Sequence, residues 1–504
     1  MYFQTVDLLN LLYQNELFMK TAVVIGAGIG GIAAALRLSK KGYQVIVFEA
    51  NNYPGGKLSA FSLGKYRFDA GPSLFTMPHF VNELFELHGE KASDFFTYKK
   101  KKIACEYFWE DKTRITAYAD PKRFLKEVQN KLDVKASVLQ EYLQRAKKKF
   151  DLTAPLFLDQ SLHKFKGFLN TKTLKALLNF NLYEINQNLH TVNARQLKEP
   201  HLVQMYDRYA TYNGSSPYQT PGIMTLVQHL EQEYGTFVPD GGMEQITLSL
   251  HALAKRKGVT FHMGEKVNQI LLERDRAIGV KTEKQTLKSD IILSNMDIFP
   301  TYKRLLKNTK APDRILSQEP SSSAIIFYWG VQQKFDQLDL HNIFFSKDYK
   351  AEFEAIFNQN KPSDDFTVYV NITSKDVPKD APKGGENWFV MINTPADHGQ
   401  DWEQIKNQLR EKTIAKLNRI LKTDLNPLIK EEEFLTPRMI QQKTSSHLGA
   451  LYGSSSNDKM AAFLRHPNFS SKIKNLYFCG GSVHPGGGIP LCLLSAKIAT
   501  DLIP

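Results

Sequence analysis

A short apolar segment that runs into a glycine-rich turn constrains the fold of this chain more than any other feature. The apolar run at residues 20–25 leads into Gly-Ala-Gly-Ile-Gly-Gly at 26–31, and an alanine-rich helix pattern follows at 32–38. A second apolar run at 44–48 ends at Glu49. This order of strand, glycine turn, helix, strand and acidic residue predicts an α/β fold of the Rossmann type that binds a dinucleotide.

Each residue of the glycine pattern has a physical role. Gly26 permits the tight turn, Gly28 lets the main chain approach a pyrophosphate, and Gly31 lets the helix pack closely against the strand. The helix N-terminus offers N–H groups and a partial positive charge to phosphates. Glu49 lies about 20 residues beyond Gly31, the place of a carboxylate that holds ribose hydroxyls and disfavours a 2′-phosphate. The alternative is a structural turn without a ligand, and the flanking strands with Glu49 disfavour it.

Two further glycine-rich segments indicate which dinucleotide is bound. Gly56 and Lys57 follow soon after Glu49; a glycine pair lets the main chain lie against a cofactor and a lysine can neutralise a phosphate, although a solvated surface turn is the alternative. Near the C-terminus, a strand-like run at 475–479 leads into a glycine-rich turn and a helix pattern at 491–499. One long cofactor that contacts both ends of the chain explains this arrangement, and FAD has the required length.

These motifs resemble those of the bacterial carotenoid desaturases, the flavoenzymes related to phytoene desaturase. The resemblance runs from about residue 20 to the end of the chain. The N-terminal motifs are shared with amine oxidases and protoporphyrinogen oxidases, whereas the segments 208–218 and 484–490 are more specific. The segments that carry the resemblance are the glycine unit with Glu49, Pro54–Lys57, Phe68–Ser73, Arg208–Tyr218, Val238–Met243, Ile292–Asp297 and His484–Pro490.

The resemblance implies a fold and an activity. The fold is a Rossmann-type FAD-binding domain of the glutathione-reductase-like family, with an inserted mixed-sheet substrate domain and a helical, membrane-facing segment. The activity is introduction of a C=C bond into a carotenoid. The Pro54–Lys57 turn departs from the Gly-Gly-Arg turn that is common in phytoene desaturases. Together with the Arg208–Tyr218 segment, it is closer to the hydroxycarotenoid 3,4-desaturases. Phytoene desaturase, a carotenoid isomerase, a flavin amine oxidase and a non-catalytic lipid-escort protein are the alternatives.

The predicted sites are mainly cofactor contacts, because no side chain accepts two electrons and the flavin must carry them. A quinone or oxygen then reoxidises the flavin. Arg208 and His484 are the candidate catalytic residues, at the substrate end or in proton handling, with an ion pair and a hydrogen-bonded turn as their structural alternatives. The strand-like run 323–331 is a candidate for the apolar lining, with plain sheet core as the alternative. The residues predicted for adenosine and pyrophosphate are Gly26, Gly28, Gly31, Glu49, Gly56, Lys57 and, through its backbone by resemblance, Val267; those for the flavin half are Gly71, Pro72, Gly481, Gly488, Ile489 and Pro490.

The length of 504 residues exceeds the size at which one core usually keeps growing, which predicts two domains. Motifs at both ends make the cofactor domain discontinuous. We expect residues 1–18 to be an extension, since Met19 directly precedes the first strand. The predicted FAD-binding domain comprises 19–90, 236–300 and 430–504, and the predicted substrate and membrane-contact domain comprises 91–235 and 301–429.

The charge balance points to a membrane surface as a partner. Lys and Arg number 65 against 52 Asp and Glu, a formal charge of +13, and no nucleic-acid recognition module is evident. Lys147–Lys149 precede apolar residues interleaved with lysines at 154–169, which suits the lipid interface, although an ordinary amphipathic helix packed on the core is an equal alternative. No apolar run is long enough to span a bilayer. We expect a cytoplasmic protein on the inner face of the membrane.

Cysteine and metal chemistry have little support in the sequence. The three cysteines, Cys105, Cys479 and Cys492, are too scattered for a disulfide framework and fit core packing in a reducing compartment. No cluster with metal-ligand spacing is evident, and no metal site is predicted.

Overall fold

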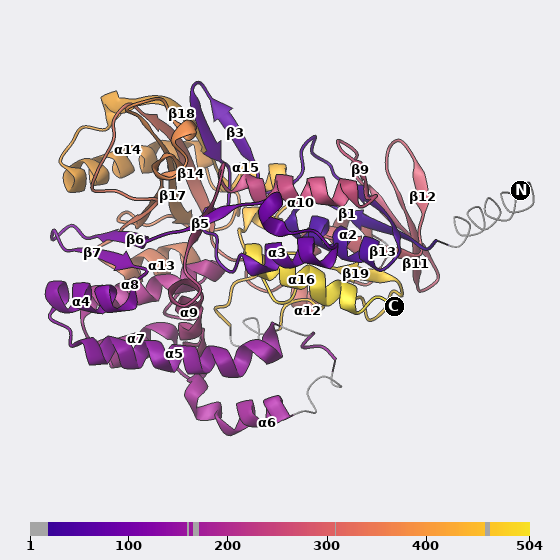
Figure 1. The fold of residues 1–504 in the computed structure, drawn as a ribbon, viewed down its shortest axis with the longest axis horizontal. Coiled ribbons are helices and arrows are strands. Elements are labelled where there is room, and N and C mark those ends of the chain that lie inside the picture. The colour runs from indigo at the N-terminus through magenta and orange to yellow at the C-terminus, as the bar shows by residue number, and fades with distance from the viewer. Residues whose placement is uncertain (1–18, 159–160, 165–170, 308, 459–463) are drawn as a thin grey trace, which may run out of the picture.

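The computed structural model describes residues 19–158, 161–164, 171–307, 309–458 and 464–504 (Figure 1). The predicted extension at 1–18 lies outside the described residues. Two sheets stand at opposite ends of the molecule in Figure 1, one around β1 and β13 and the other around β14 and β17.

The first sheet is entirely parallel and has the order β19-β13-β1-β2-β9. Its central strands are rich in buried β-branched residues, as expected for a parallel sheet covered on both faces. The strands come from the beginning, middle and end of the described chain, so the sheet joins distant segments. They are β1 (Thr21–Ile25), β2 (Gln44–Phe48), β9 (Thr260–His262), β13 (Ile291–Ser294) and β19 (Leu476–Phe478).

Helices cover one face of the parallel sheet and a small antiparallel sheet covers the other. The helices α2 (Ile29–Lys40), α10 (Glu244–Arg256) and α16 (Ile489–Asp501) share one apolar core with alternate residues of β1 and β13. The remaining residues of these strands pack against the three-stranded crossover sheet. That sheet comprises β10 (Gln269–Glu273), β11 (Arg276–Lys281) and β12 (Thr286–Lys288).

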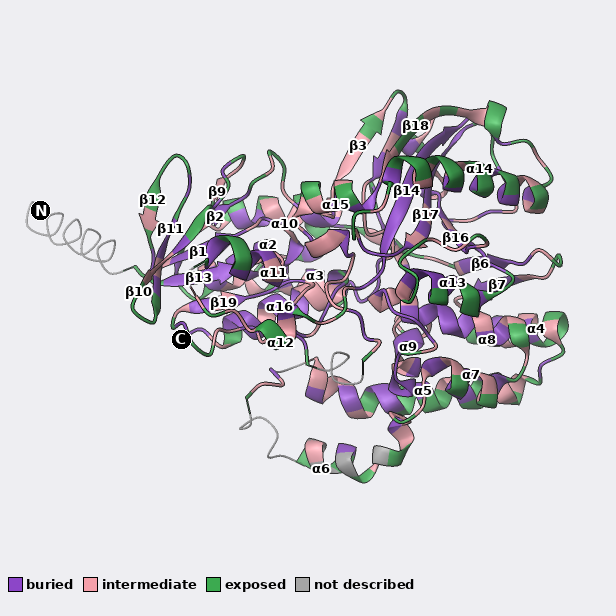
Figure 2. Ribbon diagram, turned by 180° about the vertical axis from the view of Figure 1, so that it is seen from behind, coloured by how far each residue is buried: buried purple, intermediate pink, exposed green. Residues whose placement is uncertain are grey.

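The second sheet has seven strands in the order β18-β14-β17-β16-β15-β6-β7, and its strand pairs are antiparallel except β15 with β6. One face packs against α14 (Trp402–Leu421) around Trp329 and Trp388. Both β14 and β17 are almost entirely buried (Figure 2). The strands are β6 (Ile103–Phe108), β7 (Arg114–Tyr118), β14 (Ser323–Val331), β15 (His341–Phe344), β16 (Val368–Asn371), β17 (Glu386–Thr394) and β18 (Ile429–Leu435).

A helical layer lies beside the seven-stranded sheet. It contains α5 (Ala136–Phe157), α7 (Leu189–Leu197), α8 (Pro200–Asp207) and α9 (Val227–Gln232), and α6 (Thr171–Leu178) stands at its outer edge (Figure 1). In the described part of the chain, no helix combines the length and apolarity needed to cross a bilayer.

The position of β18 bears on the predicted domain boundaries. The FAD-binding domain was expected to resume at residue 430, but β18 pairs with β14 in the seven-stranded sheet. Residues 429–435 therefore lie with the segments expected to form the substrate domain.

Candidate cofactor and substrate cavity

A cavity of about 1530 Å³ reaches from the edge of the parallel sheet to one face of the seven-stranded sheet. The predicted site residues line it, with the single exception of Gly31. They are Gly26, Gly28, Glu49, Gly56, Lys57, Gly71, Pro72, Arg208, Val267, Gly481, His484, Gly488, Ile489 and Pro490. Residues from both ends of the chain therefore share one cavity.

Gly31 acts in packing and does not line the cavity. A Cβ at Gly31 would lie 2.0 Å from the carbonyl oxygen of Gly26, so a larger residue would push α2 away from the glycine turn. This is the close helix–strand approach that the glycine pattern predicts.

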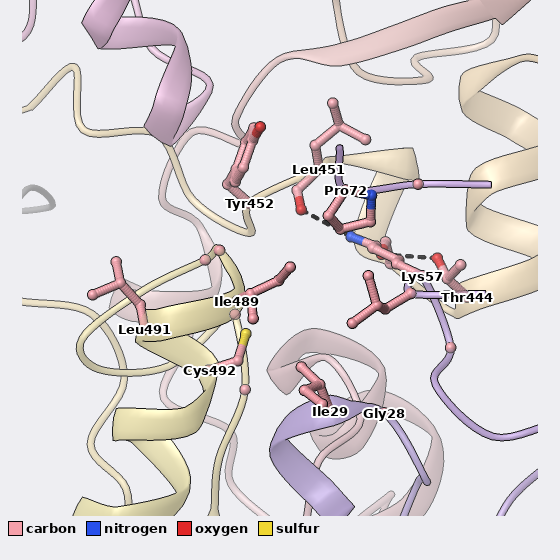
Figure 3. Close-up of a pocket in the computed structure, with 18 of the residues that line it drawn as sticks. Gly28, Ile29, Lys57, Pro72, Thr444, Leu451, Tyr452, Ile489, Leu491 and Cys492 are labelled. Carbon is pink, nitrogen blue, oxygen red and sulfur yellow. Dashed lines mark hydrogen bonds between the residues drawn. The ribbon is translucent and has the colours of Figure 1, made fainter. Parts of the chain in front are cut away.

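Two helix N-termini open onto the cavity. The N-cap residues of α2 and α16 are Gly28 and Gly488, and neither helix start receives a side-chain cap. Ile29 and Ile489, the first residues of these helices, line the cavity, and Figure 3 shows them on neighbouring parts of its wall. Uncapped helix starts leave backbone N–H groups for an anionic ligand. Gly488 has φ of 108°, a conformation that favours glycine.

Glu49 connects the glycine turn to the segment that follows β2. Its Oε2 accepts a hydrogen bond from the Ala27 N–H at 2.7 Å, and its Oε1 accepts one from the Asn51 N–H at 2.9 Å. The backbone of Glu49 also bonds Glu265, close to Val267. The carboxylate is thus fixed at the cavity wall, with lone pairs left for further donors.

Lys57 is buried and its ammonium contacts backbone carbonyls. Its Nζ donates to the oxygens of Ala450 at 3.2 Å and Leu451 at 2.9 Å, and Figure 3 shows it beside Pro72. Burial lowers the pKa of Lys57. The phosphate contact predicted for this residue remains a prediction, while these bonds tie the N-terminal turn to the C-terminal part of the chain.

Gly71 and Pro72 follow β4 (Tyr66–Asp69) in a turn that the seven-stranded sheet holds in place. A Cβ at Gly71 would lie 2.1 Å from the Lys57 oxygen, so only glycine fits. Tyr328 of β14 donates from its hydroxyl to the Ala70 oxygen at 2.6 Å. The turn is therefore fixed between the predicted cofactor pocket and the sheet.

His484 is almost fully buried in the C-terminal glycine segment. Its N–H donates to the His466 oxygen at 3.0 Å, and its own carbonyl accepts from Asn468 Nδ2 at 2.8 Å and Ser495 Oγ at 2.7 Å. These bonds hold the segment against α16.

Arg208 lies in a cluster of tyrosines and one carboxylate. Its guanidinium is 4.5 to 5.4 Å from three tyrosine ring centroids, hydrogen-bonds two of their hydroxyls and stands 3.4 Å from Glu231. The side chain is 7% exposed. This geometry favours the ion-pair alternative for Arg208 over a free catalytic group. The tyrosines are Tyr107, Tyr209 and Tyr212.

The far wall of the cavity is one face of the seven-stranded sheet. Ile326 and Tyr328 of β14, two residues apart, both line it, so the strand predicted at 323–331 does contribute to the lining. Phe389 and Met391 of β17 pair with them across the ladder. The intervening residues of β14 face α14.

Two cavity residues, Asn295 and Arg465, are not among the predicted site residues. Asn295 follows β13 and lies against Gly28, Gly30 and Gly480. Arg465 is 3% exposed, donates from Nη1 to the Tyr452 oxygen at 2.8 Å, and has no carboxylate partner among the described residues. Burial lowers the pKa of this guanidinium to about 10. Asn295 belongs to the Ile292–Asp297 segment that carries the family resemblance, whereas no local motif indicates Arg465.

The predicted basic cluster Lys147–Lys149 is not a uniformly solvated surface. Lys149 is fully buried and its Nζ bonds Glu184 at 2.5 Å and Thr225 at 2.7 Å. The apolar residues that follow, Phe157, Leu158 and Leu162, line the cavity. Residues 159–160 and 165–170 of the predicted lipid-interface segment lie outside the described residues.

Known proteins resemble this chain over nearly its whole length. The family model for flavin containing amine oxidoreductases matches residues 29–504. A 1-hydroxycarotenoid 3,4-desaturase of Flavobacterium sp. (strain P99-3) is 55% identical, over 96% of this chain and 99% of that protein. A 4,4'-diaponeurosporene oxygenase of Staphylococcus aureus (strain MSSA476) is 33% identical, over 96% and 98%.

Solved structures share the fold at low identity. An oxidoreductase from Methanosarcina mazei superposes with a TM-score of 0.62 at 16% identity, over 95% of this chain and all of that one. A putrescine oxidase bound to putrescine gives a TM-score of 0.61 at 12% identity, over 96% of this chain and 99% of that one.

The chain therefore belongs to the family of flavin-containing amine oxidoreductases, with their mixed-sheet, FAD-binding fold. Within that family it stands with the carotenoid desaturases, alongside the hydroxycarotenoid desaturases, as the resemblance of its motifs predicted. It is a flavoenzyme, and FAD is its cofactor.

The cavity fits FAD on structural grounds. Two uncapped helix starts face it, and glycines line it at Gly26, Gly28, Gly56 and Gly488 where a longer side chain would narrow the pocket. Glu49 stands at the end near Val267, where we expect the adenosine ribose, and Gly481 and Ile489 lie along the part where we expect the flavin.

Proposed function

We propose that this protein is an FAD-dependent carotenoid desaturase that introduces the 3,4 double bond into a 1-hydroxylated carotenoid, acyclic or monocyclic. The observation that carries the proposal is that one cavity contains both the glycine-lined cofactor residues and the apolar wall of Ile326, Phe389 and Met391. The 55% identical relative that is named as a 1-hydroxycarotenoid 3,4-desaturase supports the substrate and the bond.

The cofactor and the protein contribute different parts of the proposed reaction. FAD, when bound, supplies the two-electron acceptor that desaturation of a hydrocarbon needs. The Ala70–Ser73 turn, held by Tyr328, sets the distance between the cofactor pocket and the sheet. The wall residues Ile326, Phe389 and Met391 exclude water and align a polyene along the sheet face.

Arg208 and His484 remain our proposed candidates for contact with the substrate end or for proton handling. Both line the cavity, which supports the proposal. The ion pair of Arg208 with Glu231 supports the structural alternative for that residue.

We keep the glutathione-reductase-like affiliation and the discontinuous two-domain division as proposals. The parallel sheet with a three-stranded antiparallel crossover sheet supports the affiliation. In the proposed division the last FAD-binding segment begins after β18 and not at residue 430.

We also propose peripheral attachment to the inner face of the cytoplasmic membrane, with a quinone or oxygen as electron acceptor. The cavity reaches Phe157, Leu158 and Leu162, and Ala176 of α6 packs in one apolar cluster with Leu156 and Phe157 of α5. On α6, Lys175 is exposed and Leu178 is 78% exposed. An exposed apolar side chain beside a lysine suits the lipid interface and gives a carotenoid a direct way in from the bilayer.

Sedimentation with vesicles tests the membrane proposal. The holoprotein should sediment with vesicles that contain anionic lipid, and the double variant Lys175→Glu with Leu178→Asp should release it. The matched control is Leu248→Asp with Lys255→Glu on α10, which changes another exposed leucine and lysine. Equal sedimentation of both variants contradicts the proposed contact.

Product analysis tests the activity. The purified protein, loaded with FAD and lipid, is given phytoene, a 1-hydroxylated carotenoid and the same carotenoid without the hydroxyl. We expect loss of two hydrogens and a red-shifted absorption only where a polyene with a hydroxylated end is present. Conversion of phytoene alone indicates a phytoene desaturase, and a changed double-bond geometry without mass loss indicates an isomerase.

A further inference from the structure

A short array of polar side chains interrupts the apolar wall of the cavity. Ser73 Oγ is 2.8 Å from the Tyr369 hydroxyl, and that hydroxyl is 2.7 Å from Nδ1 of His341. Ser73, Tyr369 and His341 line the cavity, and so does Ile343 on the same face of β15. His341 is 4% exposed.

The surroundings of His341 define which ring nitrogen carries the proton. Asn371 Nδ2 donates to the Leu340 oxygen at 3.0 Å and lies 3.3 Å from His341 Nδ1. An amide nitrogen only donates, so Nδ1 of His341 is an acceptor and the proton of the neutral ring sits on Nε2. Burial lowers the pKa of His341 to about 3, which keeps the ring neutral at physiological pH.

The Nε2–H of His341 is a buried donor without an acceptor. No hydrogen-bond partner for this atom is present in the described structure. Buried donors are nearly always satisfied, because an unsatisfied one destabilises the fold. Because the side chain of His341 lines the cavity, a ligand is one source of that acceptor.

We propose that His341 binds the hydroxyl of the substrate, with Nε2–H donating to the oxygen on C1 and with Ser73 and Tyr369 holding the imidazole in place. This inference rests on the proposed function, because it needs a substrate with a hydroxylated end. It assigns the specificity for the hydroxylated end group to one side chain of β15.

The chemistry of the substrate agrees with this position. In a 3,4-desaturation, a single methylene separates the hydroxylated carbon from the reacting bond, so the group that binds the hydroxyl has to lie beside the flavin. Ser73 directly follows Pro72 in the turn where we expect the flavin, and Tyr369 connects Ser73 to His341. The rest of the polyene then extends along the apolar strands.

Arg208 is a weaker candidate for the same role. Two tyrosine hydroxyls and the carboxylate of Glu231 already surround its guanidinium. Nε2 of His341, in contrast, has no hydrogen-bond partner in the described structure.

Paired substrates test the proposal on the purified holoenzyme. The pair is a 1-hydroxylated carotenoid and the same carotenoid without the hydroxyl, and dissociation constants are measured without oxygen by quenching of protein fluorescence. In His341→Leu, we expect the dissociation constant and the KM for the hydroxylated substrate to rise about 10- to 100-fold, with little change in the dissociation constant of the other substrate. His341→Gln, which keeps a donor, should restore part of the preference.

Two further variants distinguish loss of hydroxyl recognition from a general change in the shape of the cavity wall. Ile343→Leu changes the neighbouring cavity position on β15 and should affect both substrates alike. Tyr369→Phe removes the hydroxyl that holds the ring and should weaken the preference while FAD stays bound. If His341→Leu does not fold, Tyr369→Phe still tests the proposal.

The outcomes distinguish this inference from the proposed function. If the wild-type enzyme desaturates the hydroxylated carotenoid but the His341 and Tyr369 variants lower binding of both substrates equally, the inference is wrong and the function stands. If the wild-type enzyme converts neither substrate of the pair, the proposed function is wrong as well.

Discussion

At the scale of the residue, Glu49 shows how one side chain can order a cofactor pocket. Its two carboxylate oxygens accept N–H groups from the glycine turn, at Ala27, and from the segment after β2, at Asn51. In Glu49→Gln one oxygen becomes an NH₂ group that cannot accept, so we expect FAD affinity to fall about 10- to 100-fold. Flavin fluorescence during titration of the apoprotein measures this affinity. Glu83→Gln, which removes a carboxylate paired with Arg37 on α2, is the control and should bind FAD normally.

Arg465 gives a second prediction at this scale. A buried guanidinium without a carboxylate destabilises the apoprotein, and because Arg465 lines the cavity we expect the negative charge of bound FAD to compensate it. We expect apo Arg465→Met to unfold at the same or a higher temperature than the wild type, and the rise in unfolding temperature on addition of FAD to be smaller. Differential scanning calorimetry of apo and loaded forms measures both. An unchanged FAD-induced rise contradicts the prediction.

At the scale of the element, the contact between α2 and the glycine turn allows no side chain at Gly31. A Cβ there would lie 2.0 Å from the Gly26 oxygen, so Gly31→Ala forces α2 to move. We expect the free energy of unfolding to fall by about 1–3 kcal/mol and FAD to be lost during purification. Lys40→Ala is the control, because it shortens an exposed side chain at the end of α2. That variant should keep its flavin absorbance.

The contact between α7 and α8 predicts a dependence on pH. The hydrogen bond between His190 Nδ1 and Asp207 Oδ2, 2.7 Å long, raises the pKa of His190 in the folded state. The stabilisation is complete below the unfolded value of about 6.5 and is lost as pH rises through the folded pKa. The difference in unfolding temperature between wild type and His190→Gln should therefore shrink between about pH 6 and pH 9. The same difference measured in an Asp207→Asn background should show no such trend.

At the scale of the whole molecule, the cavity separates two sheets that FAD connects. FAD at 100 times its dissociation constant should raise the free energy of unfolding by about 2.7 kcal/mol. FMN lacks the adenosine half that we place near Glu49 and Val267, so it should stabilise the protein less at the same concentration. Chemical denaturation of the apoprotein with each nucleotide measures the effect. Equal stabilisation by both contradicts our placement of the adenosine.

The sequence predicts elements whose pattern is local. The apolar runs at 20–25 and 44–48 correspond to β1 and β2, and the run 323–331 to β14. The glycine segments at both ends meet in one cavity, as the length of FAD required. These elements could be predicted because their signals are short-range hydrophobic periodicity and the backbone geometry of glycine.

Residues whose role depends on distant partners were not predictable. His341 is a lone histidine in an apolar strand, and only Tyr369 and Asn371, on another strand, fix its ring. By its sequence, Lys149 belongs to a basic run that suits the lipid interface, but Glu184 lies beside it in the fold and permits its burial. No spacing in the sequence reports such contacts.

The strand order of the parallel sheet also affects how the protein is made. Strand β13 pairs with β19, and the second helix start at the cavity belongs to α16, so segments far along the chain complete the predicted nucleotide pocket. During translation, the first glycine turn therefore leaves the ribosome long before the residues that close over the flavin. Capture of the cofactor then has to wait until the residues through α16 have been released.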